Sequence, residues 1–280
     1  MAKVLMLHRV LPEKLITQPN AYTTFGTLIS SEYFETVLSL LKNENFEFVT
    51  ISEIASRNKK NKLVALTFDD GYSDNFEFAL PILQKYNATA TFFPVVEPCK
   101  NNSVLPLDIY YQCIDEMNLN EEQRFDFIKG ETKRKFYLAE PKEQMKLLKE
   151  LFAKLPKQNR VNYMSTEQLR QLAENGFEIG SHGMTHSLLT ADYMNEEKVL
   201  TELQQSKKWI ERVIGKNVLA YCFPSGEYNF RMTELVKQVG YTSTCLVFKK
   251  ENEKEALPSY DRIFVKPNSL DELQNALNVE

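Results

Sequence analysis

The sequence predicts an α/β protein with a largely parallel sheet. Short apolar runs suited to buried strands alternate along the 280 residues with longer segments of helical periodicity. Several of these runs end in polar or turn-forming residues. The expected strands are residues 4–7, 46–50, 63–68, 90–96, 177–181, 218–223, 242–247 and 262–265.

Apolar residues recur at helical spacing between these strands. The two clearest predicted helical faces consist of Phe34, Val37, Leu38 and Leu41, and of Val199, Leu203, Ile210 and Val213.

Three local signals predict where helices begin. Thr50 with Glu53, and Ser165 with Gln168, have the spacing of a capping box, in which a hydroxyl and a side chain three residues later cap the helix. Pro81 predicts that the helix around it starts late or kinks, because proline lacks an N–H donor.

Residues 99–160 are rich in Lys and Glu and carry helical patterns but few strand signals. They predict a helical insertion between two strands, within a single domain that spans residues 1–280. A lid, a selector of substrate length and a dimer contact are all open roles for this insertion. The oligomeric state is not readable from the sequence.

Charge and composition exclude some classes of partner. The net charge of −4 comes from 34 basic and 38 acidic residues that are mixed along the chain. Such mixing predicts no broad positive surface, so nucleic acid is not an expected partner. The apolar stretches are too short to span a membrane.

The N-terminus and the cysteines predict a cytoplasmic location. Only four consecutive apolar residues precede His8, which is too few for the core of a signal peptide. The cysteines lie far apart without a C-x-x-C pair, which argues against a zinc ribbon and a disulfide scaffold. They are Cys99, Cys113, Cys222 and Cys245.

Two of the three histidines, His182 and His186, lie in S-H-G-M-T-H. On a helical turn, residues four apart share one face, and two imidazoles there can bind one metal ion. A pair of solvated or helix-capping histidines is the alternative. A catalytic zinc site with two histidines commonly adds a carboxylate, and T-F-D-D-G offers Asp69 and Asp70.

Adjacent strand residues point to opposite faces, so Asp69 and Asp70 are expected to have different surroundings. A simple turn after the strand is the alternative reading of D-D-G. Polar or turn-forming residues also follow three other strands, at His8, His182 and Pro224. Because the carboxyl ends of strands in a β/α barrel meet at one mouth, these residues are expected to form one site.

T-F-D-D-G-Y together with S-H-x-x-x-H resembles the polysaccharide deacetylases, also called the NodB homology or carbohydrate esterase 4 family. A-T-A-T-F-F and Q-L-R-Q-L-A-E-N-G-F-E-I-G-S-H extend the resemblance over most of the chain. It implies a distorted (β/α)₇ barrel that hydrolyses N-acetyl groups, and sometimes O-acetyl groups, of sugars with one divalent metal ion. Zinc is the expected metal, with cobalt and nickel as alternatives.

The resemblance implies a role for each motif residue. Asp70, His182 and His186 are the expected metal ligands, and Asp69 is the expected general base. The backbone N–H of Tyr72 or of Ser225 would help to hold the oxyanion.

The leaving amine has to be protonated by a general acid. In many members of the family this acid is a histidine in an L-x-H motif near the C-terminus, but no histidine follows His186 here, so His8 is the expected acid. V-L-M-L-H-R-V resembles the N-terminal segment of the circularly permuted members of the family, including poly-N-acetylglucosamine deacetylases. A histidine that merely caps a strand is the alternative.

The family motif R-x-P-x-G reads C-F-P-S-G here, so its arginine is missing. Arg262 is the candidate to orient Asp69 in its place, although a surface arginine is an equal alternative. The family's D-x-x-x-W motif is also absent. The remaining residues expected at the substrate site are Tyr72, Pro224, Ser225, Gly226 and Tyr228.

The predicted function is a metal-dependent deacetylase that removes acetate from an N-acetylated amino sugar in a glycan or its precursor. An allantoinase-like hydrolase of another small amide is one alternative. A degenerate carbohydrate-binding protein without activity is the other, since two family motifs are incomplete.

Overall fold

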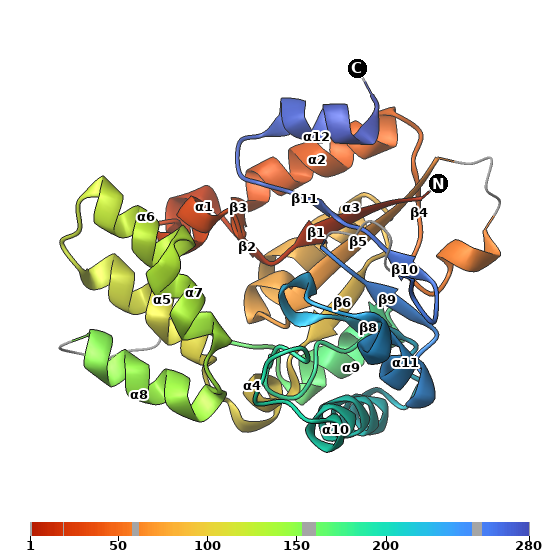
Figure 1. Ribbon diagram of the computed structural model, residues 1–280. Coiled ribbons are helices and arrows are strands. Elements are labelled where there is room, and N and C mark those ends of the chain that lie inside the picture. The colour runs from red at the N-terminus through yellow and green to blue at the C-terminus, as the bar shows by residue number, and fades with distance from the viewer. Residues whose placement is uncertain (1, 19, 58–61, 153–160, 248–253, 280) are drawn as a thin grey trace.

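The computed structural model describes residues 2–18, 20–57, 62–152, 161–247 and 254–279. Figure 1 shows a central set of strands with helices around it. The strands are β1 (Lys3–Leu7), β2 (Arg9–Leu11), β3 (Leu28–Ser30), β4 (Glu47–Phe48), β5 (Leu63–Asp70), β6 (Thr91–Pro94), β7 (Glu178–Ile179), β8 (Ala220–Cys222), β9 (Ser243–Cys245), β10 (Ser259–Tyr260) and β11 (Ile263–Phe264).

The strands form parallel sheets, which confirms the α/β class. One sheet has the order β11-β1-β5-β6-β7, with β4 beside the start of β5, and a second has the order β10-β9-β8. β2 and β3 form a small parallel pair. One bridge between Ser181 and Tyr221 connects the segment after β7 to β8. Closure into a barrel stays a prediction.

β5 is the central strand, and all eight of its residues are buried. It lies between β1 on one side and β4 and β6 on the other. A parallel strand covered on both faces needs a continuous apolar run, and L-V-A-L-T-F is such a run. All eight strands expected from the sequence are present, most of them shorter than predicted. β2, β3 and β10, of two or three residues each, were not predicted.

The helices are α1 (Ala21–Phe25), α2 (Ser31–Asn43), α3 (Leu80–Lys85), α4 (Val96–Asn101), α5 (Pro106–Glu116), α6 (Glu121–Lys129), α7 (Glu131–Leu138), α8 (Pro141–Leu151), α9 (Thr166–Glu174), α10 (Glu196–Ile214), α11 (Phe230–Gln238) and α12 (Leu270–Leu277). The apolar face predicted for α2 is fully buried. On α10, Val213 is only partly buried, and Ile214 takes its place in the core.

One of the two capping boxes predicted from the sequence starts a helix in the structure. Ser165 caps α9, and both hydrogen bonds of the box with Gln168 are present. The Glu53 carboxylate accepts a hydrogen bond from the Thr50 backbone N–H, but only a 3₁₀ turn follows there, so the predicted helix is wrong. Near Pro81 the helix changes from a π turn at Asn75–Ala79 to α3.

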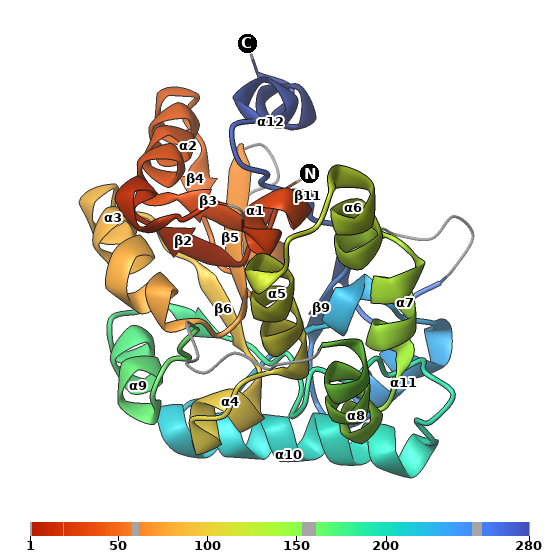
Figure 2. The ribbon, with the colours of Figure 1, turned by 90° about the vertical axis from the view of Figure 1, so that its left-hand side faces the viewer.

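The segment between β6 and β7 is helical in the part that the structure describes. Residues 106–151 form α5 to α8, and no strand occurs among residues 99–152. Residues 153–160 of the predicted insertion lie outside the described residues. Figure 2 shows α5, α6, α7 and α8 in front of the sheets, and Figure 1 shows that β1 runs toward this side.

None of the helices in the described part of the chain combines the length and apolarity that crossing a bilayer requires. The four cysteines are buried and have free thiols.

Candidate active site

Four strand ends lead into one cavity of about 300 Å³. His8 follows β1, and Asp69 and Asp70 are the last two residues of β5. His182 and Ser225 lie in the loops after β7 and β8. All five residues line the cavity, together with His186. The two acids therefore end the strand, and the chain also turns there as the alternative reading expected: Asp70 has φ +70°, and the Gly71 N–H donates to the Asp69 carbonyl oxygen at 2.9 Å.

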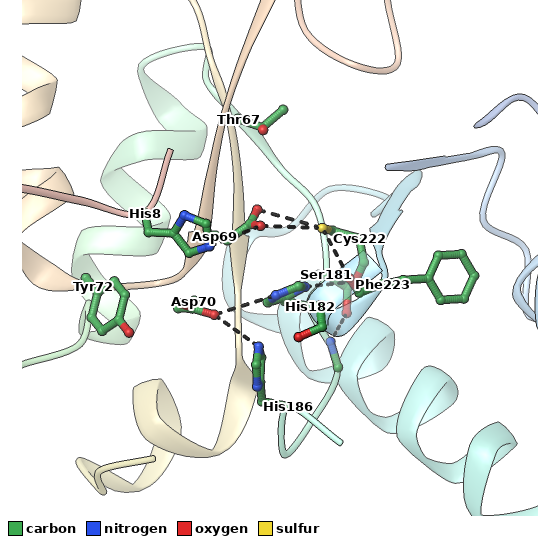
Figure 3. A network of polar contacts seen from close by, with 12 residues as sticks. His8, Thr67, Asp69, Asp70, Tyr72, Ser181, His182, His186, Cys222 and Phe223 are labelled. Atoms are coloured by element: carbon green, nitrogen blue, oxygen red, sulfur yellow. Dashed lines mark hydrogen bonds and ion pairs between the residues drawn. The ribbon is translucent and has the colours of Figure 1, made fainter. Parts of the chain in front are cut away.

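Asp70, His182 and His186 form a compact group of possible metal ligands. Asp70 Oδ1 lies 3.6 Å from His182 Nε2 and 3.4 Å from His186 Nε2. Figure 3 shows the Asp70 carboxylate facing both imidazoles. Asp70 Oδ1 is buried and has no hydrogen-bond partner among the described residues. A buried carboxylate oxygen without a donor, facing two imidazole nitrogens, fits a divalent cation.

The protonation of these residues also fits a cation. Burial lowers the pKa of both His182 and His186 and keeps the imidazoles neutral, the form that binds metal. Burial, with the nearby Asp69 and Asp108 carboxylates, raises the pKa of Asp70. A cation bound there would favour ionised Asp70 instead.

His182 is oriented by its other ring nitrogen. His182 Nδ1 lies 2.8 Å from the backbone carbonyl oxygen of Cys222, which accepts its hydrogen. This bond leaves His182 Nε2 free to face Asp70 as a ligand.

A second group of possible ligands, Asp69, His182 and Cys222, is less suited to a metal. Asp69 is already paired with Arg262, at 2.7 Å. Burial raises the pKa of the Cys222 thiol, which disfavours the thiolate that metals bind.

The expectation that His182 and His186 share a helical turn is wrong. The segment between them is a loop in which Gly183 has φ +86° and His186 has φ +63°. Left-handed backbone at these positions turns the loop back on itself, and the two imidazole centres lie 5.0 Å apart. A loop, rather than a helix, thus brings the two histidines of H-x-x-x-H together.

Asp69 forms an ion pair with Arg262. Arg262 Nη1 donates to Asp69 Oδ1 at 2.7 Å and to Thr67 Oγ1 at 3.2 Å, and Arg262 Nε donates to the Leu246 carbonyl. Arg262 is only 5% exposed, which excludes the surface arginine that the sequence left open. Burial alone would raise the pKa of Asp69, but Arg262, His182 and His8 outweigh it and hold that pKa well below its usual range.

His8 lies on the same side of the cavity as Asp69. His8 Nε2 is 3.9 Å from Asp69 Oδ2, and the imidazole packs edge-on against Phe264. Burial lowers the pKa of His8 to about 4, although the Asp69 carboxylate opposes this shift. His8 Nδ1 has no hydrogen-bond partner among the described residues.

Of the other residues expected at the substrate site, some line the cavity and some do not. Ser225, with φ +55°, lines the cavity and donates to the Tyr137 hydroxyl at 2.5 Å. Pro224, Gly226 and Tyr228 are buried and are not among the lining residues. Their contact with substrate stays a prediction.

The comparison with known families decides the classification. The sequence model of the family described as polysaccharide deacetylase matches residues 56–244, more than half of the chain. The chain belongs to the polysaccharide deacetylase family. The matched span includes Asp69, Asp70, His182 and His186 but neither His8 nor Arg262.

Individual relatives of this family member are distant. It is 22% identical over 218 residues to the Bacillus subtilis (strain 168) protein named "Putative polysaccharide deacetylase YxkH". The match covers 76% of this chain, and the chain spans only 56% of that curated relative.

Solved structures of polysaccharide deacetylases show the same fold. The Streptococcus pyogenes deacetylase PplD in complex with acetate is 19% identical, with a TM-score of 0.66, and 99% of this chain and 97% of that chain are covered. IcaB from Ammonifex degensii is 17% identical with the same TM-score and the same coverage. At these identities the likeness shows the fold alone.

Two features of this polysaccharide deacetylase were missed from the sequence. The first is Glu202 on α10, which is 8% exposed. Glu202 Oε2 accepts hydrogen bonds from the backbone N–H groups of Met184 at 2.6 Å and Thr185 at 3.2 Å, and Oε1 accepts from the Thr185 hydroxyl. This carboxylate therefore holds the loop between the two histidines.

The second is Asp108 on α5, which is 1% exposed. Asp108 Oδ1 accepts from the hydroxyls of Tyr22 at 2.6 Å and Tyr72 at 2.9 Å, and Oδ2 accepts from Tyr163. The helical segment is thus bound to the tyrosine of T-F-D-D-G-Y. In the sequence, Asp108 resembles an ordinary acid in the first turn of a helix.

Glu202→Gln is expected to weaken metal binding by about 10- to 100-fold, as outer contacts of metal ligands do. An amide offers one oxygen acceptor, so it cannot accept from the Thr185 hydroxyl and from the loop N–H groups as Glu202 does. Competition with a chelator measures the affinity, and Glu197→Gln, on the exposed face of α10, is the matched control. Equal affinity of wild type and Glu202→Gln would show that the loop keeps its shape without this carboxylate.

Proposed function

We propose that this chain is a metal-dependent deacetylase that hydrolyses the N-acetyl group of an amino sugar and releases acetate and the free amine. One arrangement carries the proposal: Asp70, His182 and His186 face one another in a cavity that also holds Asp69, paired with Arg262. Membership of the polysaccharide deacetylase family supports a carbohydrate substrate. One solved structure of similar fold is that of a de-N-acetylase from Aggregatibacter actinomycetemcomitans.

The metal site is proposed for Asp70, His182 and His186, with zinc as the metal and cobalt or nickel as alternatives. Two neutral imidazoles and one carboxylate are a common ligand set of catalytic zinc, which leaves a coordination position open. When bound, such an ion supplies Lewis-acid polarisation of the acetamide carbonyl and of the attacking water.

Asp69 is the proposed general base. Its carboxylate stays ionised because the Arg262 guanidinium holds its pKa low, so it can accept the proton of the attacking water. Arg262 fixes one carboxylate oxygen with a hydrogen bond, and Asp69 Oδ2 faces His8. Arg262 thereby serves in place of the arginine that C-F-P-S-G lacks. The oxyanion would be held by the N–H of Tyr72 or Ser225, both of which line the cavity.

His8 is the proposed proton donor to the leaving amine. Its lowered pKa means that the imidazole is neutral before the reaction, so the proton that it delivers has to come from the reaction itself. His8 Nε2 lies 3.9 Å from Asp69 Oδ2, so the two side chains have to approach to about 2.6–3.2 Å before the proton can pass between them. The water's proton thus moves to Asp69, then to His8, and finally to the amine nitrogen as its bond to the acetyl carbon breaks.

His8→Ala is expected to slow amide hydrolysis by about 100-fold or more, within the range for general acid–base catalysis. Activated esters should be affected far less, because their leaving groups depart without a proton. The rates of acetate release from an N-acetyl sugar and from an aryl acetate measure the difference. A small and equal loss on both substrates would return His8 to a structural role.

The test of the proposed function is acetate release from a panel of N-acetylated sugars and oligosaccharides, with zinc, cobalt and nickel compared. Release of acetate from sugar amides supports the proposal. Hydrolysis of small non-sugar amides alone would favour the allantoinase-like alternative. Sugar binding without release by the metal-loaded chain would favour a carbohydrate-binding protein.

We propose a single domain that closes as a distorted (β/α)₇ barrel of the circularly permuted branch. Only Asp261 and Arg262 separate β10, which pairs with β9, from β11, which pairs with β1, and this supports closure. One buried apolar core contains both Leu66 of β5 and Tyr110 of α5, which supports a single domain. The cytoplasmic location stays a prediction from the sequence.

A further inference from the structure

The helical segment contributes a wall of the cavity. Tyr111 on α5 and Lys133 and Tyr137 on α7 line it, together with Phe25 at the end of α1. Lys133 Nζ lies 3.4 Å from the centre of the Phe25 ring, 5.7 Å from that of Tyr111 and 5.9 Å from that of Tyr137. Three aromatic rings thus fix an ammonium group in the wall.

Lys133 has no acidic partner in the described part of the chain, where no ion pair involves it. The carboxylates of the cavity and its wall interact with other residues. Asp69 forms an ion pair with Arg262, and Asp108 accepts hydrogen bonds from three tyrosine hydroxyls. Asp70 faces the two histidines. Burial, with the charge of Lys129, lowers the pKa of Lys133 to about 7, as expected for an ammonium that lacks a counter-charge.

Two hydroxyl groups in the same cavity are also unsatisfied. Tyr111 and Thr27 both line the cavity, and their side-chain oxygens are buried without a hydrogen-bond partner among the described residues. Buried hydroxyls without a partner are uncommon in folded proteins and often indicate a missing ligand or water. Lys133, Tyr111 and Thr27 offer donors to an acceptor that the described residues do not supply.

Lys133 lies close enough to the catalytic groups for one sugar to reach both. The ring centre of Tyr137 lies 5.9 Å from Lys133 Nζ and 6.1 Å from the ring centre of His186, and all three residues line the cavity. With a divalent cation at Asp70, the cavity would carry net positive charge, because Asp69 and Arg262 neutralise each other. Such a cavity attracts anions.

We propose that Lys133, with Tyr111 and Thr27, binds an anionic group, a carboxylate or a phosphate, carried by the N-acetylated sugar or by its immediate neighbour in the glycan. This inference rests on the proposed function and narrows its substrate class to acidic sugars. It also gives the helical segment a role, since α7 supplies the cation and α5 a hydroxyl.

The experiment compares matched acidic and neutral substrates on the metal-loaded full chain. The carboxylate arm uses an N-acetylhexosamine with an O-3 lactyl ether and its methyl ester, and the phosphate arm uses an N-acetylhexosamine 6-phosphate and its unphosphorylated parent. Wild type, Lys133→Gln and Lys133→Arg are tested, with Lys135→Gln, on the exposed face of α7, as the control.

For one of the two arms, wild type is expected to prefer the acidic substrate, and Lys133→Gln to lower the acidic-to-neutral ratio of kcat/KM by about 10- to 100-fold, mainly through KM. Lys133→Arg should restore part of the ratio, and Lys135→Gln should keep it. The arm that responds identifies the anion. A ratio that is unchanged by Lys133→Gln in both arms overturns the inference, even if the chain is a good deacetylase.

Calorimetric binding of the same four sugars separates this inference from the proposed function. If wild type released no acetate from any sugar, the proposed function would fail. Tighter binding of an acidic sugar than of its neutral partner, lost in Lys133→Gln, would still support the anion site. Equal binding of acidic and neutral sugars to wild type would overturn it.

Discussion

Asp69→Asn is expected to lower kcat for acetate release by about 10²- to 10⁴-fold, the range for removal of a general base, while the chain should still bind one divalent ion. The amide cannot accept the proton of the attacking water, but its oxygen still accepts the hydrogen bond from Arg262. The substitution also leaves the buried Arg262 guanidinium without its counter-charge, so a loss of stability of about 3–5 kcal/mol is expected beside the loss of kcat. Initial rates and metal analysis of the same preparation measure the two effects.

Asp70→Asn is the matched control for this prediction, because the two residues are adjacent on β5 and face different partners. It should lose the metal and the activity together. If Asp69→Asn lost the metal and Asp70→Asn kept it, the roles of the two acids would be reversed. Thermal unfolding of both variants has to confirm that they are folded.

His182→Ala is expected to abolish stoichiometric metal binding and, with it, acetate release. The substitution removes one of the three candidate ligands and the bond from Nδ1 to the Cys222 carbonyl. Metal analysis after gel filtration should find about one ion per chain in wild type and almost none in the variant. Added zinc should raise the Tm of wild type only, because a ligand at 100 times its Kd stabilises a protein by about 2.7 kcal/mol.

The chain has three histidines, so His8→Ala provides a control of the same chemical kind. It should keep the metal, since His8 faces Asp69 and is not among the candidate ligands. An active wild type that carries no metal, or a His182→Ala chain that keeps it, would contradict the metal site.

Much of the sheet was predictable because a strand that is covered on both faces has a continuous run of apolar residues in the sequence. The run L-V-A-L-T-F of β5 is an example, because all of its residues are buried and its length is typical of a buried strand. β2, β3 and β10 were not predicted, because two or three residues carry no periodicity of their own, whereas equally short strands such as β7 and β11 lie within longer stretches typical of a strand. The capping signal at Thr50 failed because a local hydrogen bond can form without a helix after it.

The candidate site was predictable where its residues lie in compact motifs. Asp69, Asp70, His182 and His186 are in two such motifs, and the structure brings them into one cavity. The residues that support them depend on contacts between distant parts of the chain. Glu202 resembles any acid on an amphipathic helix until the fold brings the histidine loop to it.

The ion pair of Asp69 with Arg262 has a consequence for biosynthesis. Arg262 follows Asp69 by 193 residues, so at 5–20 residues per second it leaves the ribosome roughly 10–40 s later. During that interval the growing chain contains a carboxylate whose buried position has no counter-charge. The strand that carries Asp69 therefore cannot reach its final buried state as a nascent N-terminal fragment. Completion of the site waits until Arg262 has been synthesised.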